Sequence, residues 1–432
     1  MSSGAGGKIA RPWACDRDEY FTAAYSLLGE RGCDALTIAA LCNRLSVTKG
    51  SFYHHFEDMP DFVTAFAAYW QAWLVERLEG YATESDLRRR VELIGNAVFL
   101  MTPGMRAMRA WARTNPTIAK AMLAPHRSAA AVTAATVAAM TEDDNSGQVL
   151  AAMGITMCIG TQHRPRSMTP EHFLQLVAML YRGIGVENEL LQVGGETSLR
   201  VHPWRRRLAP VSTTPAPGSD SQSPVGAPVT APVWSRPAGR EDMKDRYFAA
   251  AAELLAEQGS DGLTIAALVE RLELTKGSFH HRFGALPAFV EQFAAEWEQI
   301  ELERLDACLA ERNPWRRMEL LHSRLLLRPA PFETAWRAWG QRNVLVAAAL
   351  RHVDHNQERA LALTLGQLLD RPDGILLAEM TLALGLGLHQ GYPPMDRTLT
   401  DRVAIEWMRR MVGIDAEVRT ETGVPTLAFS RV

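Results

Sequence analysis

The sequence has few cysteines and no long apolar run. Five cysteines occur among 432 residues, and no two of them form a CxxC pair. An odd number of cysteines without metal-ligand spacing is atypical of a disulfide framework, so we expect a reducing, cytoplasmic environment. The first 20 residues lack the apolar stretch of a secretory signal. No run of about 18 apolar residues occurs, so we expect no membrane span. With 47% hydrophobic and 22% charged residues, we expect a soluble, folded chain.

The sequence also lacks common enzyme motifs and a strong net charge. It contains no GxSxG, HExxH, P-loop or GxGxxG pattern, so we predict neither an enzyme nor a bound cofactor. The formal net charge of −3 excludes a globally basic nucleic-acid binder, but not one with a locally basic surface. His352 and His355 flank Asp354 without a supporting Cys or Glu pattern. We interpret them as an exposed helix face and predict no metal site.

What the sequence does contain is a long internal repeat. The stretch LTIAALCNRLSVTKGSFYHHF (36–56) recurs as LTIAALVERLELTKGSFHHRF (263–283). From residue 17 to 70, at an offset of 227, roughly 32 of about 54 positions are identical. Downstream the likeness is weaker: MRAWARTNP corresponds to WRAWGQRNV at an offset of 228, and Gln162 is matched with Gln390. A period above 200 residues is too long for a solenoid and indicates two fused paralogous units.

A segment without apolar periodicity separates the two units. Residues 208–237 are rich in Pro, Ser, Thr, Ala and Gly and have almost no charge, which predicts a linker. Arg205–Arg207, just before it, is interpreted as a solvated basic run. We therefore predict five segments: a helix-turn-helix domain (14–74), a larger helical domain (75–202), the linker (203–239), a second helix-turn-helix domain (240–301) and a second larger helical domain (302–432).

Capping residues in the repeated module predict short helices joined by tight turns. Asp16–Glu19 has the form of a capping box, and Thr37 and Thr48 can cap the two helices that follow. Phe52 and Phe56, four residues apart, are expected on the buried side of the third helix. A short helix, a turn and a second helix with a polar exposed face is the helix-turn-helix plan, which places its second helix in the DNA major groove.

This module resembles the TetR family of transcriptional regulators, over about 60 residues of each half. The resemblance implies an all-α fold, in which a three-helix DNA-binding domain precedes a helical domain for ligand binding and dimerisation. It further implies an operator of double-stranded DNA and an unidentified small-molecule effector. By the matching motif, the DNA contacts would come from these positions: Thr48, Lys49, Gly50, Ser51, Tyr53, His54, Thr275, Lys276, Gly277, Ser278, His280 and His281.

The two helix-turn-helix domains, called heads below, suggest an intramolecular pseudo-dimer. Family members obtain the second head from a partner chain, whereas this chain carries both, so we predict a monomer in which the last helices of each half, near 171–183 and 400–411, pack on each other. The heads differ, because Tyr53 corresponds to His280 and His55 to Arg282, which predicts an imperfect palindrome. Two alternatives remain open. Fused chains can pair to present four heads, or the chain can be a ligand- or protein-binding scaffold that has lost DNA binding in one or both copies.

The effector site is poorly defined by sequence. Met and Trp residues at helical spacing can line an adaptable apolar pocket, although they more often form plain core. The candidates are Met101, Met105, Met108, Trp111, Met157 and Gln162 in the first half, and Trp336, Trp339, Asn343 and His389 in the second.

Overall fold

The chain is helical apart from a C-terminal β-hairpin, within the residues that the computed structural model describes. These are residues 16–87, 89–91, 93–94, 102–141, 147–164, 175–176, 179–180, 242–326, 331–369, 374–421 and 424–431. The predicted linker at 203–239, the basic run Arg205–Arg207 and the pocket candidate Met101 lie outside them.

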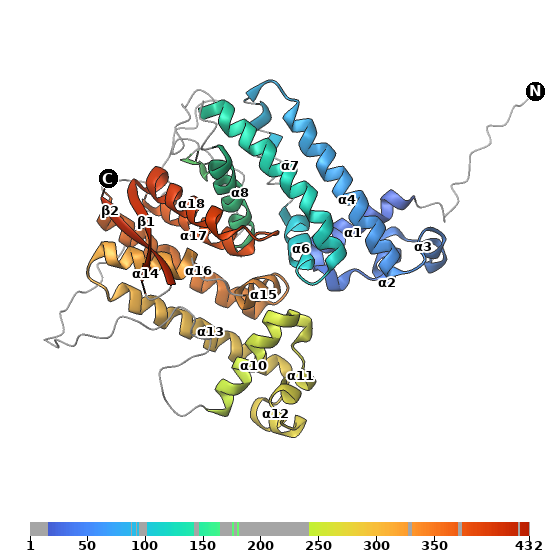
Figure 1. Cartoon of the computed structure of the whole chain (residues 1–432). Helices are drawn as coiled ribbons and strands as arrows, with labels where there is room; N and C mark the ends of the chain where they lie inside the picture. The colour runs from blue at the N-terminus through green and yellow to red at the C-terminus, as the bar shows by residue number, and fades with distance from the viewer. Residues whose placement is uncertain are drawn as a thin grey trace, which may run out of the picture.

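The two halves repeat the same order of helices (Figure 1). The first half contains α1 (Arg17–Arg31), η1 (Cys33–Ala35), α2 (Ile38–Leu45), α3 (Lys49–His55), α4 (Met59–Ala82), α6 (Thr102–Ala112), α7 (Pro116–Thr141) and α8 (Gly147–His163). The second contains α10 (Met243–Gln258), η3 (Ser260–Gly262), α11 (Ile265–Arg271), α12 (Lys276–Phe283), α13 (Leu286–Leu309), α14 (Pro314–Leu326), α15 (Pro331–Gly340), α16 (Val344–Leu368), α17 (Gly374–Gln390), α18 (Arg397–Glu406), the π-helical turn η4 (Trp407–Val412), β1 (Ile414–Glu421) and β2 (Val424–Arg431).

The short helices of each head begin at the predicted capping residues. The Thr37 hydroxyl accepts a hydrogen bond from Ala40 N at 3.1 Å, and the Thr48 hydroxyl accepts one from Ser51 N at 3.4 Å. Thr264 and Thr275 cap α11 and α12 in the same way. These bonds satisfy backbone N–H groups that have no partner within the helix, which fixes where each short helix begins.

The head and the larger domain of each half share one long helix. α4 and α13 are both 24 residues long, and each runs through a predicted domain boundary, at 74/75 and at 301/302. Phe62 and Phe66 near the start of α4 are buried with Phe52 and Phe56 of the head, which confirms the predicted buried face of the third helix. A rigid helix therefore links each reading head to the rest of its half.

The two halves contact each other mainly through α8 and α17, the most extensive helix–helix contact of the described chain (Figure 1). The helices cross at glycines that are 227 residues apart in sequence. A Cβ atom on Gly160 would overlap the backbone carbonyl of Ala383, and a Cβ on Gly387 would overlap that of Thr156. Thr156 and Ala383 are also 227 residues apart, so the same surface meets its own counterpart. Such a contact is isologous, as in a two-fold symmetric dimer.

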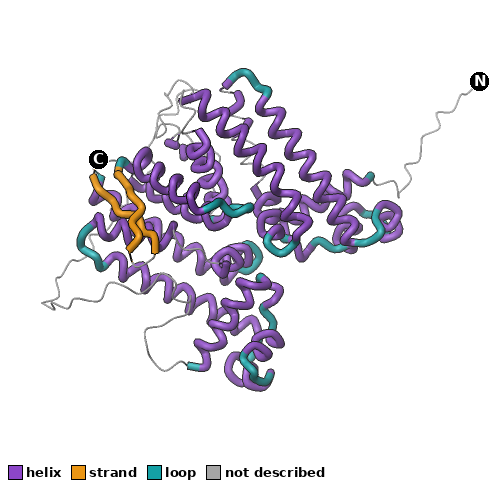
Figure 2. Tube along the Cα trace, in the orientation of Figure 1, coloured by secondary structure: helices purple, strands orange, loops and turns teal. Residues whose placement is uncertain are grey.

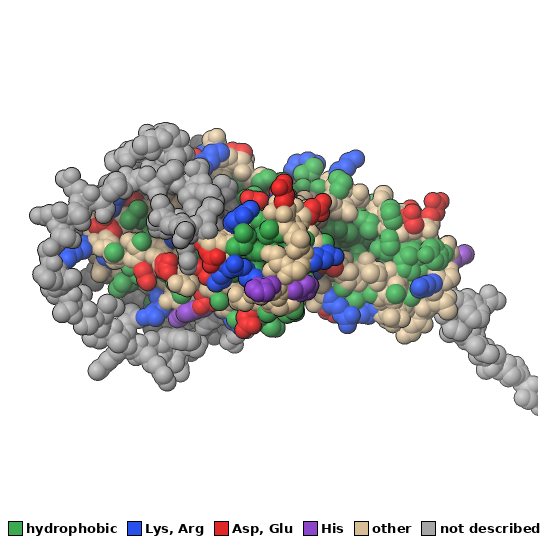
Figure 3. All heavy atoms as spheres, turned by 90° about the horizontal axis from the view of Figure 1, so that it is seen from below, with side chains coloured by type: hydrophobic (Ala, Val, Ile, Leu, Met, Phe, Trp, Pro, Cys, Tyr) green, Lys and Arg blue, Asp and Glu red, His purple; other side chains and the backbone are tan. Residues whose placement is uncertain are grey.

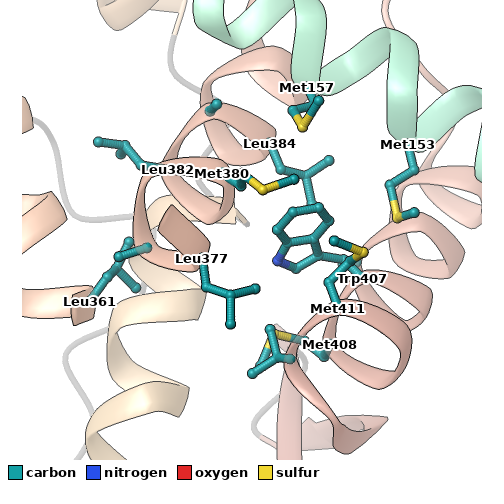
Figure 4. Close-up of a cluster of buried hydrophobic side chains, with 14 of the residues drawn as sticks. Met153, Met157, Leu361, Leu377, Met380, Leu382, Leu384, Trp407, Met408 and Met411 are labelled. Carbon is teal, nitrogen blue, oxygen red and sulfur yellow. The ribbon is translucent and has the colours of Figure 1, made fainter. Parts of the chain in front are cut away.

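Apolar side chains from both halves surround this crossing. Met153 and Met157 of α8 extend toward Trp407, which is fully buried beside Leu384 of α17 (Figure 4). The Trp407 indole N–H donates to the Thr381 hydroxyl at 3.0 Å, so its one polar atom is satisfied. The inter-half contact is therefore built like the interior of a single domain.

A buried arginine adds ion pairs across the same contact. Arg164, 6% exposed, follows α8 and donates to Glu379 of α17 at 2.6 Å and to Glu358 of α16 at 2.5 Å. Separating the two halves would leave these buried charges without partners, which is strongly unfavourable.

The predicted pairing of the last helices is covered only in part by the described residues, and it did not include the main contact. The prediction missed α8 and α17 as the main contact between the halves, because nothing in their sequences marks them as an interface. Most of 171–183 lies outside the described residues. Its described members include Leu176, Met179 and Leu180, which belong to the same apolar cluster as Trp407 and Met408.

The C-terminal hairpin was not predicted from the sequence. β1 and β2 pair antiparallel, with Ile414 opposite Arg431 and Glu421 opposite Val424, and β2 lies against α14 (Figure 2). It adds two strands to an otherwise helical fold. None of the described helices combines the length and apolar character needed to cross a membrane.

Candidate nucleic-acid interface

The surface of α3 presents a short row of exposed polar groups. Thr48, Lys49, Gly50 and His54 are exposed, and the Tyr53 ring is 55% exposed although aromatic. Thr48 uses its hydroxyl oxygen to cap the helix, which leaves its O–H free to donate outward. The helix N-terminus, the ammonium group of Lys49 and this hydroxyl together suit a phosphate oxygen.

Ser51 does not lie on this exposed surface as predicted, and Ser278 of the second head is half-buried. Ser51 is 6% exposed, and its hydroxyl accepts a hydrogen bond from the Tyr20 hydroxyl at 3.1 Å. Ser278 pairs with the Tyr247 hydroxyl at 3.4 Å. These serines face inward because they lie on the side of the helix turned toward α1 or α10. Their hydrogen bonds hold the reading helix against α1 or α10.

The glycine in the first turn of each reading helix has room around it. A Cβ atom on Gly50 would have the Thr48 hydroxyl as its nearest neighbour, at 3.6 Å, and one on Gly277 would meet that of Thr275 at 3.7 Å. Both are ordinary contacts, so the fold itself does not exclude alanine. Glycine inside a helix is less stable than alanine by roughly 0.5–1 kcal/mol. Its presence in both heads therefore suits close approach by an external partner.

The second head differs from the first in its charges. Lys276, His280 and His281 are exposed on α12, and Arg282 is ion-paired with Asp242 at 3.5 Å. The first-head equivalent of Arg282 is His55, which is half-buried with its ring against Tyr20. Histidine side chains lie beside lysine or arginine, with acidic groups nearby, on the face of the molecule seen in Figure 3. The two heads thus offer different side chains to a nucleic acid.

The predicted effector residues fall into separate surroundings. Met105, Met108 and Trp111 pack in or against the apolar core of the first head, and Trp336 and Trp339 do so in the second. Met157 lies in the apolar cluster between the halves (Figure 4). The structure therefore does not gather these residues around one pocket.

The polar candidates have defined hydrogen bonds. The Asn343 side chain caps α16 by accepting from Leu345 N at 3.0 Å and Val346 N at 3.2 Å. Gln162 accepts a hydrogen bond from the buried Arg109 through its side-chain oxygen. The Gln162 backbone carbonyl accepts from Arg106 at 3.0 Å, as the His389 carbonyl does from Thr334 at 3.4 Å. In α8 and α17 the offset is thus 227, so Gln162 corresponds to His389 rather than to Gln390.

Sequence reasoning missed the two buried arginines, Arg109 of α6 and Arg337 of α15, which are 5% and 2% exposed. They occupy the same place in the aligned stretches MRAWARTNP and WRAWGQRNV. An arginine retained between two diverged copies was the available signal.

Comparison with known proteins supports two heads of one kind. The family model described as bacterial regulatory proteins, tetR family, matches residues 21–66 and again residues 248–285. Each match contains the helix-turn-helix of its half, α2–α3 or α11–α12. No curated protein matches the chain.

Proposed function

We propose that the chain is a DNA-binding transcription regulator of the TetR family, in which α3 and α12 of one polypeptide read the two halves of a single operator; the two matches to the family model support this. The crossing of α8 and α17 carries the proposal: Gly160 and Gly387 meet each other's helix in an isologous contact, which is what a two-fold operator requires of its reader. The protein then acts as a monomer of 47.8 kDa, as a repressor released by a small-molecule effector.

The half-sites of this operator differ in the proposal. Tyr53 offers a phenol hydroxyl where the second head has the imidazole of His280, and such groups favour different base edges. Two symmetrised operators, each built from one half-site, are therefore expected to bind more weakly than the natural one.

Removing the polar side chains of each head in turn tests the proposal. Lys49→Ala/His54→Ala and Lys276→Ala/His281→Ala are each expected to weaken binding to the DNA upstream of the protein's own gene by about 10- to 100-fold. The measurement is a mobility shift at fixed salt, with the mass of the free protein from sedimentation. Arg351→Ala/His355→Ala, a similar exposed pair on α16, is the control and is expected to leave affinity unchanged.

The other outcomes identify the alternatives. Loss with only one double variant means that the other head has given up DNA binding, and no loss with either supports a scaffold. A mass near twice 47.8 kDa supports paired chains with four heads.

Alanine at Gly50 or Gly277 is expected to separate stability from DNA binding. Each substitution is expected to raise the free energy of unfolding by up to about 1 kcal/mol, because alanine favours helix and the Cβ meets no close neighbour. Each is also expected to lower operator affinity, because the added methyl group projects into the space that the DNA backbone would approach. Urea unfolding and the mobility shift measure the two effects, and unchanged affinity in both variants would contradict close approach of DNA at these glycines.

A further inference from the structure

Arg109 and Arg337 are equivalent buried arginines with opposite surroundings. The second half neutralises its arginine internally. Arg337 donates to both carboxylate oxygens of Asp354, at 3.0 and 2.7 Å, and to Glu333 at 3.0 Å. Burial alone would lower the pKa of Arg337, but these two carboxylates raise it above its usual value. A paired fork of this kind is the favoured geometry between arginine and a carboxylate.

The first half has no such carboxylates. At the matching offset of 228, His126 takes the place of Asp354 and Met105 the place of Glu333. Arg109 donates to the neutral side-chain oxygen of Gln162, and its Nε atom has no hydrogen-bond partner among the described residues. The guanidinium group is therefore buried without a counter-charge from the described part of the chain.

More positive charge gathers around Arg109. Arg106, one turn earlier on α6, and Arg113, just after the end of α6, stand where the second half has Thr334 and Gln341. Within the described residues, neither forms an ion pair with a carboxylate. Burial, together with both neighbouring arginines, lowers the pKa of Arg109 to about 10, so it still carries its charge at neutral pH.

The other ionisable groups nearby do not compensate for this charge. Burial raises the pKa of Tyr25 and that of the Cys158 thiol to about 12, so both are neutral at pH 7. His163 is 7% exposed, and neither of its ring nitrogens has a described partner. Burial, with Arg109 nearby, holds the pKa of His163 well below its usual range, which leaves a neutral ring able to donate one hydrogen bond.

We propose that Arg109, with Arg106, Arg113 and His163, binds the carboxylate of a small organic effector, and that this site exists in the first half alone. The proposal deepens the ligand response of the proposed function, and it rests on that function for the regulatory role of the bound molecule. We choose a carboxylate because Asp354 pairs with Arg337, the equivalent arginine of the second half. A carboxylate is therefore expected to suit the position beside Arg109. The half-buried Met105 and Trp111, on the same helix, suit an apolar remainder of the molecule.

The site lies where a ligand can influence both halves. α6 packs on α1 of the first head, and Gly104 of α6 lies so close to the Tyr25 ring that a Cβ there would overlap it. Arg113 also donates to the backbone carbonyls of His389 and Gly391 in the second half, both at 3.3 Å. A carboxylate that draws these arginines together would therefore shift α6 against the head and against the other half.

Binding of carboxylates and of matched neutral amides to the full chain tests the proposal. Benzoate and hexanoate are expected to bind with dissociation constants below about 1 mM in calorimetry, and benzamide and hexanamide at least about tenfold more weakly. Arg109→Gln is expected to weaken carboxylate binding at least about tenfold, whereas Arg351→Gln, at an exposed position of α16, is expected to leave it unchanged.

His126→Asp is the sharper variant, because it gives the first half the carboxylate of the second. It is expected to raise the thermal midpoint and to abolish benzoate binding. A lowered midpoint, equal binding of acids and amides, or unchanged binding in Arg109→Gln would each overturn the proposal.

Measuring binding without DNA separates this inference from the proposed function. Carboxylate binding by a protein that does not bind DNA would remove the proposed function and leave the site. Operator binding by a protein that binds neither benzoate nor hexanoate would remove the site and leave the proposed function. If both hold, benzoate is expected to weaken operator binding in the wild-type chain and not in His126→Asp.

Discussion

Methionine in place of Arg337 is expected to lower the free energy of unfolding by about 3–5 kcal/mol, whereas methionine in place of Arg109 is expected to be neutral or stabilising. The two residues occupy equivalent positions on α15 and α6 and are almost equally buried. Burial and helix position are nearly the same for both residues. Opposite effects of the two substitutions on the free energy of unfolding would therefore report the difference in their counter-charges.

The effect at Arg337 follows from what the substitution leaves behind. Asp354 is 3% exposed, and its carboxylate would lose the only pair of guanidinium bonds that the structure gives it. At Arg109 the substitution removes a buried charge that has no described carboxylate, so desolvation is relieved and little attraction is lost. Urea unfolding followed by tryptophan fluorescence measures both.

The double variant Arg337→Met/Asp354→Leu serves as the control. Replacing a whole buried pair by apolar side chains is often neutral, so this variant is expected to recover most of the stability lost in Arg337→Met. Equal destabilisation by Arg109→Met and Arg337→Met would show that Arg109 has a counter-charge of its own.

The heads could be predicted from sequence because their signals are local. Thr37 and Thr48 lie one residue before the helices that they cap, and Phe52 and Phe56 lie on one face of a single helix. The repetition of the module then supplied a second observation of each feature. Caps, turns and helical spacing act over a few residues, so a sequence shows them directly.

The contact between the halves could not be predicted, because its signals are not local. Gly160 and Gly387 look like residues that weaken a helix until the opposing backbone is seen. Arg109 and Arg337 look like exposed charges, since arginine is rarely buried without a partner. Asp354 was interpreted as part of an exposed helix face, but it is buried, whereas His352 and His355 are exposed. Its partner Arg337 lies on another helix.

Alanine at Gly160 or Gly387 is expected to destabilise the chain by about 1–3 kcal/mol, although alanine favours helix at both positions. The added Cβ would overlap a backbone carbonyl, of Ala383 or of Thr156, and a backbone cannot move aside as a flexible side chain can. The helices must separate, and the apolar cluster around Trp407 must loosen with them.

Gly366→Ala in α16 is the matched control. It also places alanine inside a helix, but no heavy atom lies within 4 Å of the new Cβ, so a gain of up to about 1 kcal/mol is expected. Urea unfolding compares the three variants. A similar gain for Gly160→Ala would mean that α8 and α17 do not cross closely in solution.

The reciprocal geometry of the crossing also predicts where amide hydrogen exchange will rise. Because each glycine meets the partner helix at the equivalent residue, either substitution is expected to raise amide exchange in both α8 and α17. The double variant is expected to lose less than the sum of the single variants, because the first alanine already opens the crossing that the second would open. Operator affinity is expected to fall with it, while binding to an isolated half-site is retained, because this crossing is the most extensive contact between the halves that carry α3 and α12.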